Sequence, residues 1–149
     1  MLAYPAMPVF AMALVALFVK TTVTSMLQVA SRLRAGTFLL PEDAALMRTR
    51  PVAAEAAFVQ RCANVWRNDV ENLPLFLVLA LTHVLLGASR ESAQWLFTTF
   101  VALRYAHTAV YLRGLQPWRA LLYLSGLAVC GVIAARVLIL VLAGLKMFS

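Results

Sequence analysis

The sequence is poor in charge, since only 13% of its 149 residues are charged whereas 63% are hydrophobic. Soluble domains usually carry about 25% charged residues, so this scarcity excludes an ordinary soluble domain and indicates an integral membrane protein. There are only two cysteines, Cys62 and Cys130, and their placement in apolar segments offers no disulfide framework. Because no internal repeat, low-complexity tract or second domain is visible, we expect one membrane domain over residues 1–149.

Four apolar segments are long enough to cross a bilayer, which takes about 20 helical residues. They cover about 8–34, 62–87, 93–113 and 118–146, and a polar loop occupies about 35–61. Each segment is too long for a transmembrane strand of about 10 residues and lacks strict alternation, so α-helices remain. The sequence therefore predicts an all-α integral membrane protein with a bundle of four transmembrane helices.

Basic residues outnumber acidic ones by 13 to 6, which gives a net charge of +7. In a membrane protein this excess reports on sidedness, and we do not expect nucleic acid as a partner. The first and third loops are flanked by six basic residues, Arg32, Arg34, Arg48, Arg50, Arg113 and Arg119, whereas the opposite side has only Arg90 and Lys146. By the positive-inside rule these loops face the cytosol and both termini face the opposite side. A bacterial inner membrane and an endoplasmic reticulum both fit this pattern.

The second apolar segment opens with a polar stripe. Asn64, Arg67, Asn68 and Glu71 lie at i, i+3, i+4 and i+7 and so share one helical face, whereas Asp69 falls off that face. An Arg67–Glu71 pair would explain two of these residues by mutual neutralisation. Ionisable groups at membrane depth are costly and usually functional, so four polar residues on one stripe favour a binding surface.

Polar residues recur on single faces of the other segments. The first segment carries Lys20, Thr24, Gln28 and Arg32, the third carries Arg104, His107, Thr108 and Tyr111, and the fourth opens with Arg119 and Tyr123. These faces converge toward the cytosolic ends of the segments. The chemistry suits a small peptide with free carboxylates and an amine, and a fixed cation such as Arg119 favours a thiolate over a thiol.

Three further expectations concern residues that we do not assign to the binding surface. Lys20 and Arg136 are expected to find partners inside the bundle, because charges in a membrane segment usually face other helices. His83 has no polar companion at helical spacing and is expected to be a core residue. No metal site is expected, because His, Cys and carboxylate residues do not gather at ligand spacing.

The motifs together resemble the MAPEG family, membrane-associated proteins of eicosanoid and glutathione metabolism, and particularly its microsomal glutathione transferase and prostaglandin E synthase branch. The resemblance covers almost the whole chain. It rests on Lys20 with Arg32, Pro41-Glu42-Asp43-Ala44, Asn68-Asp69-x-Glu71 followed by Pro74 and Phe76, Arg104-x-x-His107-Thr108-x-x-Tyr111, and Arg119 with Tyr123.

The resemblance implies a homotrimer that binds glutathione, as co-substrate, between subunits near the cytosolic side. A lipophilic electrophile or lipid hydroperoxide would enter from the membrane lipid. The implied glutathione-binding residues are Arg32, Asn64, Arg67, Asn68, Glu71, His107, Tyr111, Arg119 and Tyr123. Two residues carry implied catalytic roles: Arg119 stabilises the glutathione thiolate, and Asp43 matches a loop aspartate proposed to act in prostaglandin isomerisation.

The chain also departs from the family pattern at three positions. Asn64 stands where the relatives carry arginine, Trp66 where they carry histidine, and Ala120 where the prostaglandin synthase carries serine. The missing hydroxyl at Ala120 favours a membrane-bound glutathione transferase or peroxidase as the leading function. Two alternatives remain open: a glutathione-dependent isomerase of the prostaglandin E synthase type, and a non-catalytic lipid-binding scaffold.

Overall fold

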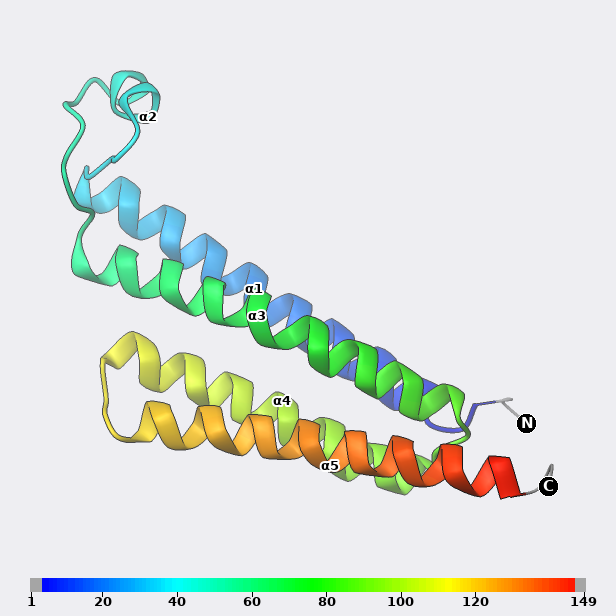
Figure 1. Ribbon diagram of the computed structural model, residues 1–149. Coiled ribbons are helices and arrows are strands. Elements are labelled where there is room, and N and C mark those ends of the chain that lie inside the picture. Colours follow the sequence, from blue (N-terminus) through cyan, green and yellow to red (C-terminus); the bar gives the residue numbers. More distant parts are fainter. Residues whose placement is uncertain (1–3, 147–149) are drawn as a thin grey trace.

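Four long helices and one short helix make up residues 4–146, the part of the chain that the computed structural model describes (Figure 1). In chain order they are α1 (Met7–Ala35), α2 (Pro41–Leu46), α3 (Ala57–Leu85), α4 (Arg90–Arg113) and α5 (Trp118–Lys146). No strand occurs within these residues. The predicted all-helical fold class is therefore confirmed.

Two helix boundaries differ from the sequence prediction, and one predicted loop contains a helix. α3 begins at Ala57 and α4 at Arg90, where the apolar pattern predicted about residues 62 and 93. Apolarity marks the stretch that suits hydrocarbon, whereas a helix continues as far as its caps allow. α4 starts early because the Ser89 side chain accepts a hydrogen bond from the Ser92 N–H at 3.2 Å.

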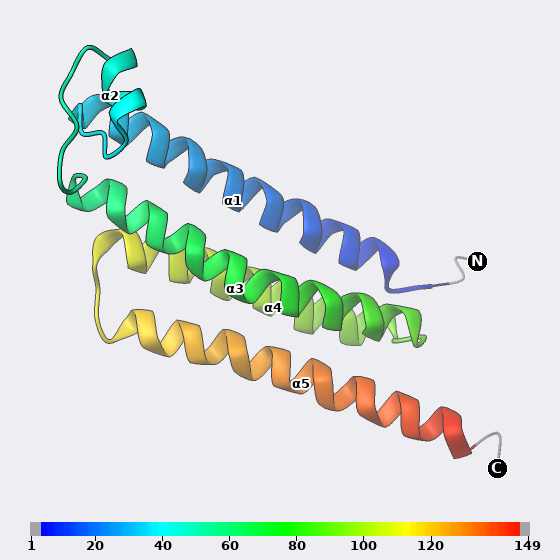
Figure 2. The same cartoon turned by 45° about the horizontal axis from the view of Figure 1, so that its top comes forward.

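The helices run alongside one another with their connections at two ends (Figures 1 and 2). At one end, the loop end, the C-terminus of α1 and the N-terminus of α3 lie near the α4–α5 turn. At the other, the turn end, the α3–α4 turn lies near the start of α1 and the end of α5. α1 and α5 each contact α3 and α4. The polar faces predicted to converge thus share the loop end.

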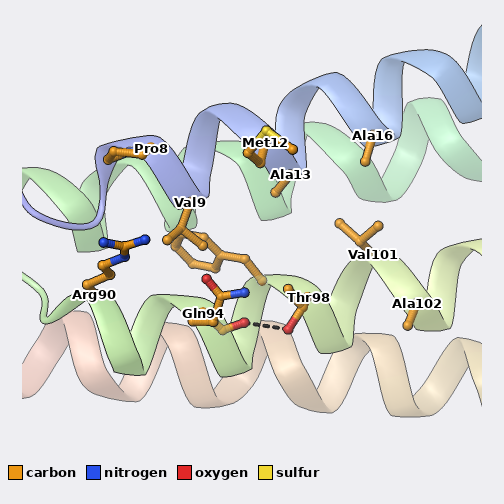
Figure 3. Close-up of a pocket in the computed structure, with 11 residues that line it drawn as sticks. Pro8, Val9, Met12, Ala13, Ala16, Arg90, Gln94, Thr98, Val101 and Ala102 are labelled. Atoms are coloured by element: carbon orange, nitrogen blue, oxygen red, sulfur yellow. Dashed lines mark hydrogen bonds between the residues drawn. The ribbon is translucent and has the colours of Figure 1, made fainter.

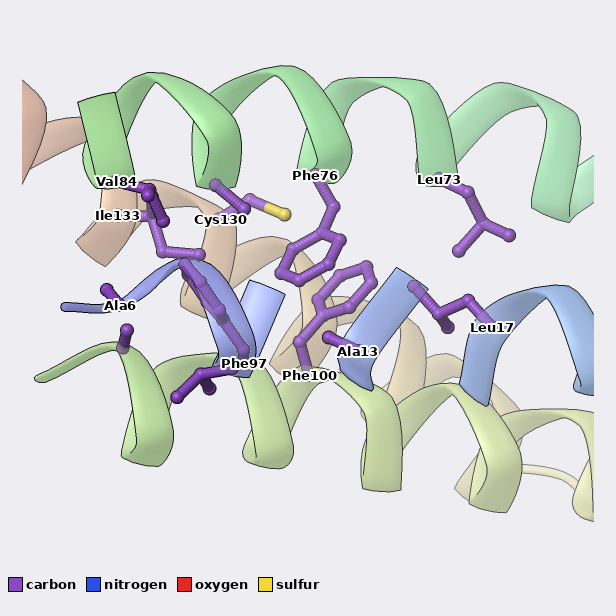
Figure 4. Packing of buried hydrophobic residues seen from close by; sticks show 13 residues of the cluster. Ala6, Ala13, Leu17, Leu73, Phe76, Val84, Phe97, Phe100, Cys130 and Ile133 are labelled. Atoms are coloured by element: carbon purple, nitrogen blue, oxygen red, sulfur yellow. The ribbon is translucent and has the colours of Figure 1, made fainter. Parts of the chain in front are cut away.

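An aromatic core fills the half of the bundle nearer the turn end (Figure 4). The rings of Phe76 on α3 and Phe100 on α4 stack with centroids 3.8 Å apart, and Phe97 meets Phe76 edge-on at 5.7 Å. Leu17 on α1 and Ile133 on α5 complete this core and are almost fully buried. Burial of such rings is a main source of packing energy, so this half fixes how the helices fit together.

The outer surface of the bundle is strongly apolar. α1 and α5 are both long and apolar enough to cross a membrane, judged by length and composition. Large hydrophobic side chains face outward, including Met12 (71% exposed) and Ile139 (64% exposed). Soluble monomers rarely expose contiguous apolar surface on this scale, so the surface is that of a membrane protein. Membrane crossing by α3 and α4 remains a prediction.

Candidate functional site

A buried cluster of charges joins three helices near the middle of the bundle, on the loop-end side of the aromatic core. Lys20 on α1 forms an ion pair with the Oδ2 atom of Asp69 on α3. Arg104 on α4 donates from Nη2 to Asp69 Oδ1 at 3.1 Å and to Asn68 Oδ1 at 2.5 Å. The side chains of Lys20, Asp69 and Arg104 are each only 2% exposed. Two cations against one carboxylate leave this cluster with a net charge of +1.

Asp69 therefore has a larger structural role than the sequence pattern indicated. The pattern put Asp69 off the polar face of α3, and it does point away from Arg67, into the bundle. Its partners come from α1 and α4, so spacing along α3 alone reveals neither of them. The expectation that Lys20 finds a partner within the bundle is confirmed.

An open recess of about 370 Å³ lies beside this cluster and is formed by α3, α4, α5 and the α4–α5 turn. It is lined by Asn68, His107, Tyr111, Gln116, Arg119, Ala120, Tyr123 and Leu124. Five of the predicted glutathione-binding residues are among them: Asn68, His107, Tyr111, Arg119 and Tyr123. We call this cavity the Arg119 recess.

Neutral groups hold Arg119 in place within the recess. Its guanidinium carbon lies 4.7 Å from the centre of the Tyr111 ring, in cation–π geometry. With its amide oxygen facing the guanidinium, Gln116 accepts hydrogen bonds from Nη2 at 2.6 Å and from Nε at 3.0 Å. No carboxylate lines the recess, and Arg119 forms no ion pair with any carboxylate of residues 4–146. Its charge remains available to an anion.

Two buried nitrogen atoms near the recess have unused hydrogen-bonding capacity. Within the described part of the chain, neither Nδ1 of His107 nor Nε of Arg104 has a hydrogen-bond partner. The His107 ring meets Tyr111 edge-on, with centroids 5.7 Å apart. Buried polar groups are normally paired, so these two atoms keep hydrogen-bonding capacity that residues 4–146 do not use.

Four predicted glutathione-binding residues do not line the Arg119 recess of a single chain. Arg32 instead donates from Nε to Glu55 Oε1 at 2.5 Å, beside the loop that follows α1. Asn64 is half-buried, and Arg67 and Glu71 are exposed. Within residues 4–146 no ion pair joins Arg67 to Glu71, so mutual neutralisation does not account for them.

Asp43 lies apart from Arg119. It is half-buried in the first turn of α2, which projects beyond the C-terminal end of α1 (Figures 1 and 2). Both views place α2 on the side of the bundle away from α5, which carries Arg119. One chain therefore does not bring its two predicted catalytic residues into a common site.

Sequence reasoning was wrong about Arg136 and missed Gln116. Arg136 is exposed and forms no ion pair with a carboxylate of residues 4–146, so it is not a partner in the bundle interior. Gln116 lies outside the four apolar segments, in the α4–α5 turn. Its position immediately before Pro117, at the start of α5, was the sequence feature that could have identified it as a site residue. The expectation for His83 is confirmed, because it is buried against Phe97.

A second recess, between α1 and α4, is larger and more apolar (Figure 3). It has a volume of about 440 Å³, and Met12, Ala13 and Val101 contribute to its wall. Arg90 and Gln94 lie at its polar side, toward the turn end. It contains none of the predicted site residues, so it is separate from the Arg119 recess.

Comparison with known proteins gives a consistent picture. The model of the MAPEG family matches residues 10–139. Prostaglandin E synthase from Homo sapiens is 32% identical over 135 residues, which cover 90% of this chain and 89% of that protein. The Equus caballus protein of the same name is 32% identical over 133 residues, covering 89% and 87%. Microsomal glutathione S-transferase 1 from Bos taurus is 38% identical over 81 residues, covering 54% and 52%.

Proposed function

Since the chain belongs to the MAPEG family, we propose that it is a membrane-bound glutathione-dependent enzyme, specifically a transferase or peroxidase, whose reaction centre is the Arg119 recess. The similarity to a microsomal glutathione S-transferase supports glutathione as co-substrate. The outward-facing apolar surface supports delivery of a lipophilic second substrate from the bilayer. In the membrane orientation that we propose, the loop end of the bundle faces the cytosol.

The observation that carries the proposal is that the Arg119 guanidinium, held only by neutral groups, has no ion-pair partner among residues 4–146 and lies in a recess without carboxylates. A fixed cation beside the glutathione sulfur favours the thiolate, which is the nucleophilic form. The thiolate forms a carbon–sulfur bond to an electrophile while the leaving group departs with its bonding electrons. With a lipid hydroperoxide it attacks the terminal oxygen and releases the alcohol, and a second glutathione then reduces the resulting sulfenic acid.

The peptide part of glutathione needs more polar contacts than this recess offers. Asn68 lines the recess, whereas Arg67 and Glu71 on the same helix are exposed and accessible to a second chain. We propose that Arg32, Asn64, Arg67 and Glu71 complete the site across the interface of a homotrimer. In that assembly Asp43 of one chain is also free to approach the recess of another.

Replacement of Arg119 tests the proposal, with Arg113→Ala as the matched control. Arg113 is an exposed cation in the last turn of α4, near the same turn but outside the recess. Loss of one transition-state donor typically costs about 100-fold or more in turnover, so Arg119→Ala should lose most kcat toward a chloronitroaromatic electrophile. Glutathione affinity, measured by calorimetric titration in detergent, should change less.

The two variants and the wild type give distinguishable outcomes. Wild-type rates in Arg119→Ala would contradict the assignment of Arg119. If the wild-type chain produces no heat of binding at millimolar glutathione, it is not a glutathione enzyme, and the result favours a lipid-binding scaffold. Equal losses in Arg119→Ala and Arg113→Ala would assign the effect to general charge and not to the recess.

A second candidate function is the isomerase reaction of a prostaglandin E synthase. It is favoured by the relatives of that name, which match about nine-tenths of the chain. Ala120, which lines the recess directly after Arg119, is the position that separates the two candidates. It provides a methyl group where a hydroxyl would be able to polarise the thiol.

A further inference from the structure

A polar cavity at the turn end of the bundle has no part in the proposed reaction. It has a volume of about 510 Å³ and is lined by His83, Gly87, Ala88, Ser89, Ser92, Arg136, Ile139 and Leu140. We propose that this cavity, the Arg136 site, binds the phosphate-bearing headgroup of an anionic membrane lipid. The site lies at the opposite end of the bundle from Arg119, and the inference does not depend on the proposed enzymatic function.

The side chains of the Arg136 site suit a phosphate group. Arg136 is exposed and forms no ion pair with a carboxylate in the part of the chain that the structure describes. A guanidinium presents a planar fork of donors that matches phosphate oxygens bidentately. The hydroxyl groups of Ser89 and Ser92 lie on the same cavity wall and add further donors.

A buried histidine in the wall supplies an independent sign of polar function. His83 is only 2% exposed and lies with its Nε2 atom 3.5 Å from the hydroxyl oxygen of Ser92. Its Nδ1 atom is buried and has no hydrogen-bond partner among the described residues. Buried polar atoms are normally paired, so His83 keeps hydrogen-bonding capacity beside the cavity that the described residues do not use.

The position of the site favours a lipid over a free anion. The cavity includes the α3–α4 turn at the turn end of the bundle. With α3 and α4 crossing the bilayer as the sequence predicts, this turn lies at the membrane boundary. Trp95 lines an adjoining recess and is 71% exposed, as expected for an aromatic anchor at headgroup depth. Leu138, Ile139 and Leu142 are exposed on α5 beside the site. A free phosphate ion makes no favourable contact with this apolar surface, whereas the acyl chains of a lipid pack against it.

One carboxylate near the site opposes anion binding and therefore provides a further test. Glu91 lines the adjoining recess of about 330 Å³ together with Arg136, but it does not approach within ion-pair distance of it. Its negative charge repels an approaching phosphate. Glu91→Gln should therefore strengthen the binding of an anionic lipid, provided that the lipid occupies the Arg136 site.

The test measures lipid binding to the full chain in neutral detergent by native mass spectrometry. The probes are short-chain phosphatidylglycerol, phosphatidylcholine of the same chain length, and inorganic phosphate. Arg136→Gln is compared with Arg90→Gln, which removes the same charge at the same end of the bundle but from the recess between α1 and α4. Charge-assisted hydrogen bonds contribute about 1.5 kcal/mol or more, so Arg136→Gln should weaken phosphatidylglycerol binding about tenfold.

The expected pattern has three parts. The wild type should prefer phosphatidylglycerol over phosphatidylcholine, Arg90→Gln should retain that preference, and Arg136→Lys should retain only part of it because a lysine lacks the fork. Excess inorganic phosphate should compete poorly. Glutathione-dependent turnover of Arg136→Gln, if the wild type has any, should stay at the wild-type level, which separates this site from Arg119.

Four results would overturn the proposal. Equal binding of the two lipids would exclude selectivity for an anionic headgroup, and equal losses in Arg136→Gln and Arg90→Gln would exclude a specific site. Equally strong competition by inorganic phosphate would identify a site for free anions. A change of oligomer mass in Arg136→Gln without a change in bound lipid would identify Arg136 as a contact between copies of the chain.

Discussion

Lys20 on α1 and Asp69 on α3 form an ion pair near the middle of both helices, where each side chain is only 2% exposed. Arg104 from α4 binds the other oxygen of the same carboxylate. One carboxylate therefore connects three helices. Charges this deep in a membrane bundle persist only when they are paired, so Asp69 holds the loop-end half together as the aromatic rings hold the other half.

Removal of this carboxylate should strongly destabilise the protein. Asp69→Asn leaves Lys20 and Arg104 buried without an anion, and breaking a buried pair typically costs about 3–5 kcal/mol. Thermal unfolding in detergent should show a much lower midpoint than for the wild type. Glu71→Gln, which neutralises an exposed carboxylate on the same helix, should leave the midpoint nearly unchanged. Similar midpoints for Asp69→Asn and the wild type would contradict a structural role for the cluster.

The aromatic core gives a second stability prediction. Phe76 is fully buried and stacks on Phe100, and loss of a buried ring to alanine typically costs about 3–5 kcal/mol. Phe76→Ala should therefore lower the unfolding midpoint markedly. Phe18→Ala is the matched control, since Phe18 is 67% exposed on α1. An equal decrease in both variants would show that outward-facing rings contribute as much as the core.

Ala120 provides the test between the two enzymatic candidates. We expect Ala120→Ser to increase endoperoxide isomerisation, because the new hydroxyl would lie in the recess next to Arg119 and polarise the glutathione thiol. Conversion of a prostaglandin endoperoxide should be measured beside conjugation of a chloronitroaromatic electrophile. If the unmodified chain already isomerises the endoperoxide as well as the variant does, the isomerase becomes the leading function.

Asn64 marks a position where charge should improve glutathione binding. It is half-buried on α3, one turn before Asn68, and we expect Asn64→Arg to tighten binding about tenfold through a charged hydrogen bond to a glutathione carboxylate. Gln60→Arg adds the same charge one turn earlier at an exposed position and should have little effect. Calorimetric titration measures both. No gain in Asn64→Arg, or an equal gain in Gln60→Arg, would exclude a direct contact at this position.

The sequence predicted the helices well because a long apolar run without alternation has one structural solution in a bilayer. It predicted their ends less well. Hydropathy does not record where hydrogen bonding stops, so the early starts at Ala57 and Arg90 and the short helix Pro41–Leu46 were missed. Capping residues such as Ser89 carry that information, but they are inconspicuous beside the apolar pattern.

The candidate site was predictable where its residues share a helix and less so where they come from different helices. His107 with Tyr111, and Arg119 with Tyr123, lie one turn apart and line one recess as expected. The role of Asp69 depends on helices that are distant in sequence. The prediction that Arg136 faces the bundle interior was wrong because α5 is apolar on nearly every face, so its pattern does not indicate which face packs inward.

The buried charges also have an order along the chain. Lys20 is synthesised first, Asp69 of the next long helix balances it, and Arg104 restores a positive charge only when α4 arrives. Arg119 comes last, with α5. A growing chain that has completed only α1 and α3 therefore carries an electrically balanced pair at its centre. Arg104 joins the buried cluster only with α4 and Arg119 joins the recess only with α5, so a product truncated after α3 would lack both of these cations.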